Sequence, residues 1–161
     1  MIFLANIVSF AAGVFSIISV WQKNKSKLLI YQIIEPILTG ISDFLLQAYS
    51  GCVCNVVAVI RNILCKFSID KKIISFYMIL FYIGYILFFI KDIISFIPLI
   101  ASLIYTIIIV MSENVNKIRI GVIINNSLWI IYDLIFQNYF SALRDFVLVL
   151  NAILTLVKKD I

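Results

Sequence analysis

The 161-residue chain contains no histidine and few charged residues. Without histidine it can have no Ser/His/Asp triad, no histidine-ligated metal site and no imidazole proton relay. Charged residues make up 13% of the chain and hydrophobic residues 64%, and the mean hydropathy is +1.15. Soluble domains have about 25% charged and roughly 45–50% apolar residues. The composition therefore excludes a soluble domain and predicts a membrane protein.

Cysteine is also scarce, since only Cys52, Cys54 and Cys65 are present. An odd number without a CxxC pair indicates neither a disulfide framework nor a thiolate metal site, so we expect no metal and no other cofactor. The net charge of +5 comes from lysines and arginines that stand singly or in short clusters between apolar runs. Nucleic-acid binding needs a basic surface, and this distribution does not predict one.

Seven apolar runs are each long enough to be a membrane-spanning helix. They cover residues 2–20, 28–48, 51–66, 73–90, 93–111, 119–137 and 140–157. Tight reversals are expected at Tyr49–Gly51 and at Asn138–Ser141. The sequence thus predicts an all-α membrane protein with seven transmembrane helices and almost no loops.

The positive residues alternate between connections and therefore predict the orientation. One set of connections carries ten of them: Lys23, Lys25, Lys27, Lys66, Lys71, Lys72, Lys117, Arg119, Lys158 and Lys159. The opposite set carries only Lys91. Cytoplasmic loops are enriched in lysine and arginine, so we expect the N-terminus outside and the C-terminus in the cytoplasm.

Residues 1–64 and 91–154 resemble one another at a constant offset of 90 residues. The polar matches Asp43/Asp133, Gln47/Gln137 and Tyr49/Tyr139 fall in one register across a helical hairpin. Three spans per copy, separated by one extra span, give repeats that are parallel in the membrane. We therefore predict a first three-helix bundle (1–68), a linker helix (69–91) and a second three-helix bundle (92–161).

This three-plus-one-plus-three plan resembles the SWEET and PQ-loop carriers, although the chain has no Pro-Gln dipeptide. A closer resemblance is to the YgjV family of bacterial inner-membrane proteins. It rests on Leu45–Gly51 followed by Ala58–Asn62, on Ile97 and Pro98 with Ser102, and on Ser127–Tyr132. The resemblance implies a small protein of the bacterial inner membrane.

Polar residues inside the spans are the candidate functional residues, because they are costly in lipid. We expect Asp133 and Arg144 to form a structural ion pair, Asp43 to lack a cation, and Glu35 to pair with Arg61. An unpaired Asp43 would suit the binding of a proton or a cation. The expected solute-binding residues are Glu35, Asp43, Asn55, Arg61, Asn125, Trp129, Asp133 and Asn151.

Two function classes remain open. A small polar solute transporter, working by rocking of the two bundles, explains the repeat and the intramembrane polar residues; a non-transporting scaffold or stabilising subunit is the alternative. An enzyme is not expected, because Tyr132-Asp133 lacks the companion Gly-x-Gly-Asp of intramembrane aspartyl proteases.

The expected partners are the lipid bilayer, an unidentified solute and a second copy of the chain. Polar residues that converge on one cavity would favour transport.

Overall fold

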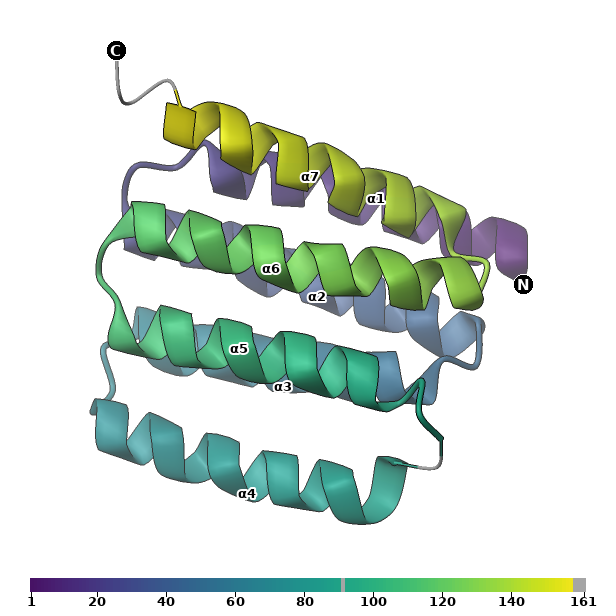
Figure 1. Ribbon diagram of the computed structural model, residues 1–161, viewed down its shortest axis with the longest axis horizontal. Helices are drawn as coiled ribbons and strands as arrows, with labels where there is room; N and C mark the ends of the chain where they lie inside the picture. The colour runs from purple at the N-terminus through teal and green to yellow at the C-terminus, as the bar shows by residue number, and fades with distance from the viewer. Residues whose placement is uncertain (91, 158–161) are drawn as a thin grey trace.

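The computed structural model describes residues 1–90 and 92–157, which form seven helices and no strand (Figure 1). The helices are α1 (Ile2–Val20), α2 (Lys25–Leu45), α3 (Tyr49–Lys66), α4 (Lys71–Phe89), α5 (Phe96–Met111), α6 (Val115–Ile135) and α7 (Tyr139–Val157). The all-α prediction is confirmed. Lys91, Lys158 and Lys159, which the charge count used, lie outside the described residues.

The helices form two layers of three with α4 at one side (Figure 1). One layer contains α1, α2 and α3, and the other contains α7, α6 and α5. The layers meet where α1 packs against α7 and where α3 packs against α5. Since α5 and α7 lie 90 residues after α1 and α3, these two contacts correspond to each other under the repeat offset. The helices α1 and α5 also run in the same direction, as parallel repeats require.

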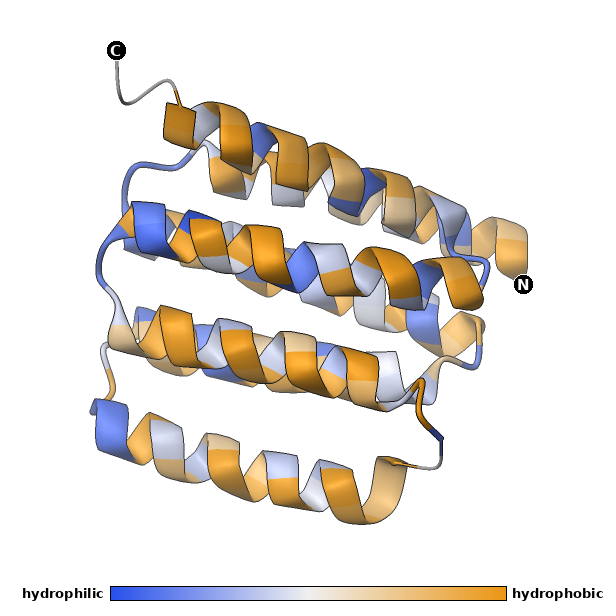
Figure 2. Cartoon of the chain, viewed as in Figure 1, coloured by the Kyte–Doolittle hydropathy of each residue, from blue (hydrophilic) through white to orange (hydrophobic). Residues whose placement is uncertain are grey.

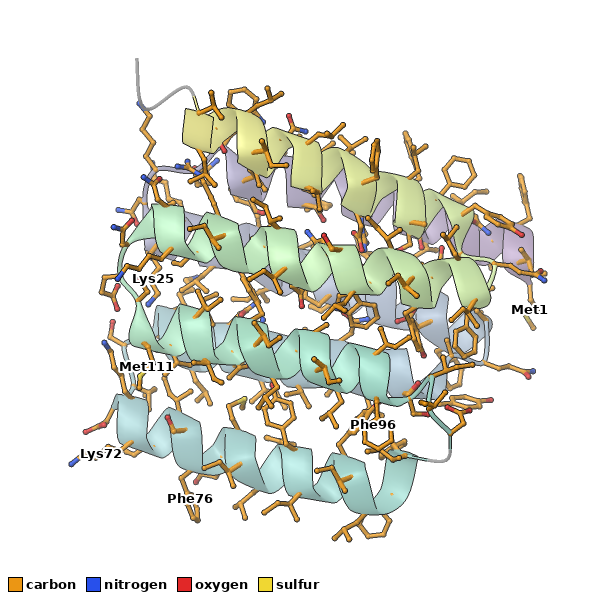
Figure 3. The ribbon with its side chains drawn as sticks, viewed as in Figure 1. Met1, Lys25, Lys72, Phe76, Phe96 and Met111 are labelled. Carbon is orange, nitrogen blue, oxygen red and sulfur yellow. The ribbon has the colours of Figure 1, made fainter. Side chains whose placement is uncertain are left out.

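The two ends of the helix bundle differ in their residues. We call one the hairpin end, because it holds Met1 and the α2–α3 and α6–α7 turns (Figures 1 and 3). We call the other the lysine end, because it holds the α1–α2, α3–α4 and α5–α6 connections with Lys25 and Lys72. Every ligand or ion that crosses the bundle must pass from one of these ends to the other.

Five helices are long and apolar enough to cross a membrane: α1, α2, α4, α6 and α7. The sixth, α5, is apolar but has only 16 residues. The seventh, α3, is more polar because it carries Asn55, Arg61 and Asn62, and all three are buried. Outside the bundle, large apolar side chains are exposed along the helices, as lipid contact requires (Figure 2).

Two helices begin three or more residues earlier than the hydropathy pattern predicts. The expected spans start at residues 28 and 119, whereas α2 starts at Lys25 and α6 at Val115. The reason is capping, since the side chains of Asn24 and Asn114 accept hydrogen bonds from the backbone N–H groups of Ser26 and Asn116. The matched cap residues place the starts of α2 and α6 90 residues apart.

The predicted reversals at Tyr49–Gly51 and Asn138–Ser141 are wrong by a few residues. The chain reverses before Tyr49 and Tyr139, and both tyrosines are the first residues of helices. Gln47 and Gln137 take the left-handed conformation, with φ of 60° and 59°. The residues that follow them donate backbone hydrogen bonds of 2.9 Å to the carbonyl oxygens of Asp43 and Asp133. This is a Schellman motif, so the glutamine match between the copies reflects helix termination.

The helix α5 begins three residues later than predicted, at Phe96 rather than 93. A local turn precedes it, in which Asp92 accepts hydrogen bonds of 2.8 Å from the side-chain hydroxyl and the backbone N–H of Ser95. These bonds hold the pKa of Asp92 below its ordinary value. A hydropathy average cannot detect a turn that is held by side-chain hydrogen bonds.

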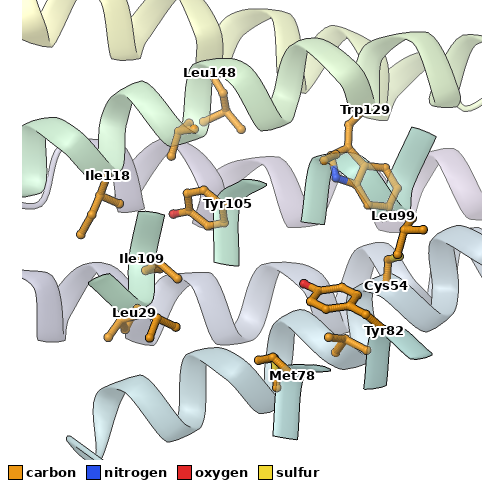
Figure 4. Close-up of a cluster of buried hydrophobic side chains, with 14 of the residues drawn as sticks. Leu29, Cys54, Met78, Tyr82, Leu99, Tyr105, Ile109, Ile118, Trp129 and Leu148 are labelled. Atoms are coloured by element: carbon orange, nitrogen blue, oxygen red, sulfur yellow. The ribbon is translucent and has the colours of Figure 1, made fainter. Parts of the chain in front are cut away.

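The helix α4 packs through a single stripe. Its buried residues are Ile74, Met78, Tyr82 and Tyr85, at helical spacing. They face α3 and α5, and Figure 4 shows Met78 and Tyr82 pointing toward the other helices of the core. The remaining surface of α4 is largely exposed and apolar. This is the arrangement expected of a helix that joins two bundles.

Candidate functional site

A polar cavity of about 70 Å³ lies between the two layers. That volume has room for several water molecules, since one water needs about 10–15 Å³ measured in the same way. The cavity is centred on α2 and α6, because Glu35 and Asn125, the middle residues of these helices, both line it. Its walls come from α1, α2, α3, α5, α6 and α7. The site therefore involves both layers.

Five of the predicted solute-binding residues line this cavity: Glu35, Asn55, Arg61, Asn125 and Trp129. Asp43, Asp133 and Asn151 are not among the described residues that form its wall. Asp43 and Asp133 are instead 1% exposed and lie nearer the hairpin end. Asn151 is partly buried on α7, nearer the lysine end.

Arg144 forms a different ion pair from the predicted one. Its Nε lies 2.7 Å from Asp145 Oδ1, and its Nη1 lies 3.2 Å from Glu35 Oε1. Nη1 also donates a hydrogen bond of 2.8 Å to Thr39 Oγ1. Gly13 makes room for this crossing, since a Cβ there would lie 3.1 Å from Arg144 Cγ. The arginine thus joins α7 to α2, and the prediction of an Asp133–Arg144 pair is wrong.

Asp133, rather than Asp43, is the unpartnered carboxylate. Among the described residues, both oxygens of Asp133 are buried without a hydrogen-bond partner, as are Ser141 Oγ and Asp145 Oδ2. Asp43 Oδ2, by contrast, accepts a hydrogen bond of 2.9 Å from Asn55 Nδ2. Asp133 still lies within electrostatic range of Asp43, Asp145 and Arg144. Within the described residues Asp43 has no cation within 4.0 Å, as expected, but it does have a neutral hydrogen-bond partner. What the sequence did not predict is that Asp133 also lacks a cation.

Arg61 is held by neutral groups rather than by Glu35. Its Nε donates to Asn62 Oδ1 at 3.0 Å, and its Nη1 donates to Thr106 Oγ1 at 3.1 Å. Its Cζ lies 4.9 Å from the centre of the Tyr105 ring. Glu35 is already engaged by Arg144 and Thr39, which is why the expected Glu35–Arg61 pair does not form.

Buried hydrogen bonds close the cavity toward the hairpin end. The hydroxyl oxygen of Tyr132 on α6 lies 2.7 Å from Ser50 Oγ and accepts a hydrogen bond of 2.9 Å from the backbone N–H of Gly51. Ser50 and Gly51 both belong to α3. Only a glycine fits at 51, since a Cβ there would lie 2.7 Å from Asp43 Oδ2 and 2.8 Å from Tyr132 Cε1. A second bridge joins the layers through Ser9, Ser42 and Asn138.

We expect Tyr132→Phe to destabilise the protein by about 1–3 kcal/mol, because the buried N–H of Gly51 would lose its acceptor. Tyr139→Phe is the matched control, since Tyr139 begins α7 and is 58% exposed. Unfolding in mixed detergent micelles measures both. Equal stability of the two variants would show that the Tyr132 hydroxyl does not hold the layers together.

The bridges at the lysine end are more exposed. Lys25 Nζ lies 2.9 Å from Glu113 Oε1, and the Glu113 side chain is 70% exposed. Arg119 donates hydrogen bonds to the backbone oxygens of Val20 and Gln22, at 3.3 and 3.4 Å. Both contacts join α1–α2 to α5–α6, so the two layers are tied together at both ends of the cavity.

Several cavity residues were not predicted. Gln32, Thr39, Asn62, Tyr105 and Asn126 all line the wall. Gln32 accepts a hydrogen bond of 2.9 Å from the Tyr105 hydroxyl, and the Asn62 side chain donates to the backbone oxygen of Gln32. Two signals were available in the sequence: Thr39 lies one helical turn after Glu35, and Asn62 follows Arg61. Tyr105 gave no signal, because an aromatic residue in an apolar run usually indicates packing.

Comparison with families of known proteins gives a match over residues 3–160 to Imp-YgjV, described as a bacterial inner membrane protein. The match covers all seven helices. Neither the curated proteins nor the solved structures contain a match to the chain.

Proposed function

The chain belongs to the Imp-YgjV family of bacterial inner membrane proteins, and from this we propose that it transports a small polar solute across that membrane. The observation that carries the proposal is the polar cavity between the layers. A protein that only filled space in the bilayer would gain nothing from a polar centre, because buried polar groups are costly in lipid. Ligand sites in membrane carriers lie near the bilayer midplane between repeats, and Glu35 and Asn125 occupy the midpoints of their helices.

The proposed mechanism is rocking of the two bundles, residues 1–68 and 92–161, about the cavity, with residues 69–91 as their connection. In this mechanism the Tyr132 contacts break when the hairpin end opens, and the Lys25 and Arg119 contacts break when the lysine end opens.

Reconstitution of the full chain into vesicles tests this function. Ala58 lines the cavity, whereas Val56 on the same helix is 53% exposed. We expect wild-type and Val56→Phe vesicles to take up at least one labelled polar solute faster than protein-free vesicles, and Ala58→Phe to abolish that uptake by filling the cavity. Uptake that is the same in Ala58→Phe and in wild type would contradict transport through this site.

A non-transporting scaffold is the second candidate, and the exposed apolar surface of α4 favours it. A scaffold needs a surface for a partner, and α4 buries only one stripe of residues in the bundle. Cross-linking in native membranes from single cysteines on this surface distinguishes the two candidates. A stoichiometric cross-linked partner together with absent solute uptake would favour the scaffold.

We also propose that the lysine end is cytoplasmic, which places the N-terminus outside. In a cysteine-free background, Gln47→Cys and Gln137→Cys mark the hairpin end and Ser68→Cys marks the lysine end; all three sites are exposed. A membrane-impermeant maleimide applied to spheroplasts should label the first two and not the third. The natural Cys54 is unsuitable, because it is 2% exposed. Labelling of Ser68→Cys alone would contradict this orientation and would place the lysine end outside.

A further inference from the structure

The charged groups on the cavity wall are not all paired with an opposite charge. Among the described residues that line it, the charged ones are Glu35, Arg61 and Arg144. Arg144 already has two carboxylate partners, Asp145 and Glu35. Within the described parts of the chain, no carboxylate lies within 4.0 Å of Arg61. Arg61 is therefore a wall cation that has no carboxylate in direct contact among the described residues.

Arg61 is also held in a fixed position. Its residue is 3% exposed, and its guanidinium contacts Asn62, Thr106 and the face of the Tyr105 ring. These partners are neutral, so they orient the guanidinium without neutralising it. A guanidinium has five N–H donors, and only two have partners among the described residues. A buried charge without a counter-ion is strongly unfavourable unless a ligand supplies one.

We propose that Arg61 binds the anionic group, a carboxylate or a phosphate, of a small solute in the cavity. Arginine suits this role, since its planar fork binds either group through two parallel hydrogen bonds. Asn125, Asn126 and Trp129 on α6 face the same cavity and offer amide hydrogen bonds and an aromatic surface to the rest of the solute. This inference rests on the proposed function and adds the chemical class of the solute to it.

Equilibrium binding to the full chain in phosphatidylcholine nanodiscs tests the inference. Trp129 lines the cavity and Trp21 is 53% exposed, so a Trp21→Phe background makes Trp129 the fluorescent reporter. The probes are succinate and inorganic phosphate, with succinamide as the uncharged counterpart of succinate. We expect a saturable change in Trp129 emission with at least one anion and none with succinamide.

Three variants identify the binding residue. Arg61→Gln should weaken anion binding about tenfold or more, and Arg61→Lys should give an intermediate affinity, because it keeps the charge and loses the fork. Lys117→Gln is the control, since Lys117 is an exposed cation on α6 that lies outside the cavity wall. It should bind the probes as wild type does. If Arg61→Gln does not fold, Arg61→Lys and the comparison of succinate with succinamide still decide the outcome.

The inference is overturned if neither anion binds, if succinamide binds as succinate does, or if Arg61→Gln binds the anion with unchanged affinity. Nanodiscs with phosphatidylglycerol test the source of the anion: displacement of the probe by this lipid would assign the site to a headgroup and overturn the solute proposal. Transport is measured separately. Anion binding without any uptake would overturn the proposed function alone, and uptake of a neutral solute that persists in Arg61→Gln would overturn this inference alone.

Discussion

Replacing Arg144 with glutamine is expected to destabilise the protein by about 3–5 kcal/mol, the usual effect of breaking a buried ion pair from one side. The substitution would leave Asp145 and Glu35 without their cation, and Asp145 is 1% exposed. It would also remove a hydrogen-bonded connection between α7 and α2 through Thr39. The loss should appear as a lower midpoint of unfolding in mixed detergent micelles.

Two further variants separate the charge from the packing. Asp145→Asn in the Arg144→Gln background should recover part of the lost stability, because it removes one of the stranded carboxylates. Arg119→Gln should have a smaller effect, since Arg119 bonds only to neutral groups at the lysine end. If Arg144→Gln is as stable as wild type, the ion pair does not hold the layers together.

Asp133→Asn is expected to preserve or raise the stability of the protein and to remove any dependence of uptake on a proton or cation gradient. The stability should not fall, because in the described part of the chain neither oxygen of Asp133 has a hydrogen-bond partner to lose. An unpartnered buried carboxylate is costly, and asparagine has almost the same shape without the charge. If the protein transports a solute as proposed, the coupling should fail, because the variant no longer has the carboxylate that would bind the proton or cation.

Asp43→Asn is the matched comparison, because Asp43 occupies the equivalent position of the first bundle. Its carboxylate accepts a hydrogen bond from Asn55, so replacement should cost about 1 kcal/mol and leave the coupling intact. Thermal unfolding and uptake with and without an imposed pH gradient measure both effects. A clear loss of stability in Asp133→Asn, or gradient-driven uptake that persists in it, would contradict this role.

The sequence was sufficient to predict the number of helices, their order and most of their boundaries. Hydropathy detects them because lipid requires long apolar runs. It missed the starts of α2 and α6, because polar caps at Asn24 and Asn114 extend these helices beyond their apolar segments. It also misplaced the reversals, because glutamine is not a residue that usually signals the left-handed conformation found at Gln47 and Gln137.

The candidate site was predicted less completely, because sequence gives the depth of a residue in the membrane better than its neighbours. Asp133 and Arg144 were expected to pair since their depths are similar. Depth alone did not show that Arg144 would reach Glu35 on α2, past the small Gly13 of α1, which leaves space for its side chain. Arg61 and Asn125 were assigned to the cavity correctly, because both are polar residues near the middle of the bundle.

The two closures of the cavity differ in their response to ionic strength. The contacts of Tyr132 at the hairpin end join neutral groups and are buried or partly buried, so dissolved salt does not screen them. The Lys25–Glu113 contact at the lysine end is charged, and its carboxylate is open to solvent. At an ionic strength of about 0.15 M the Debye length is roughly 8 Å, and exposed ion pairs weaken further as salt is added. Rising salt in the compartment that bathes the lysine end would therefore favour opening toward that compartment, while the opposite closure keeps its strength.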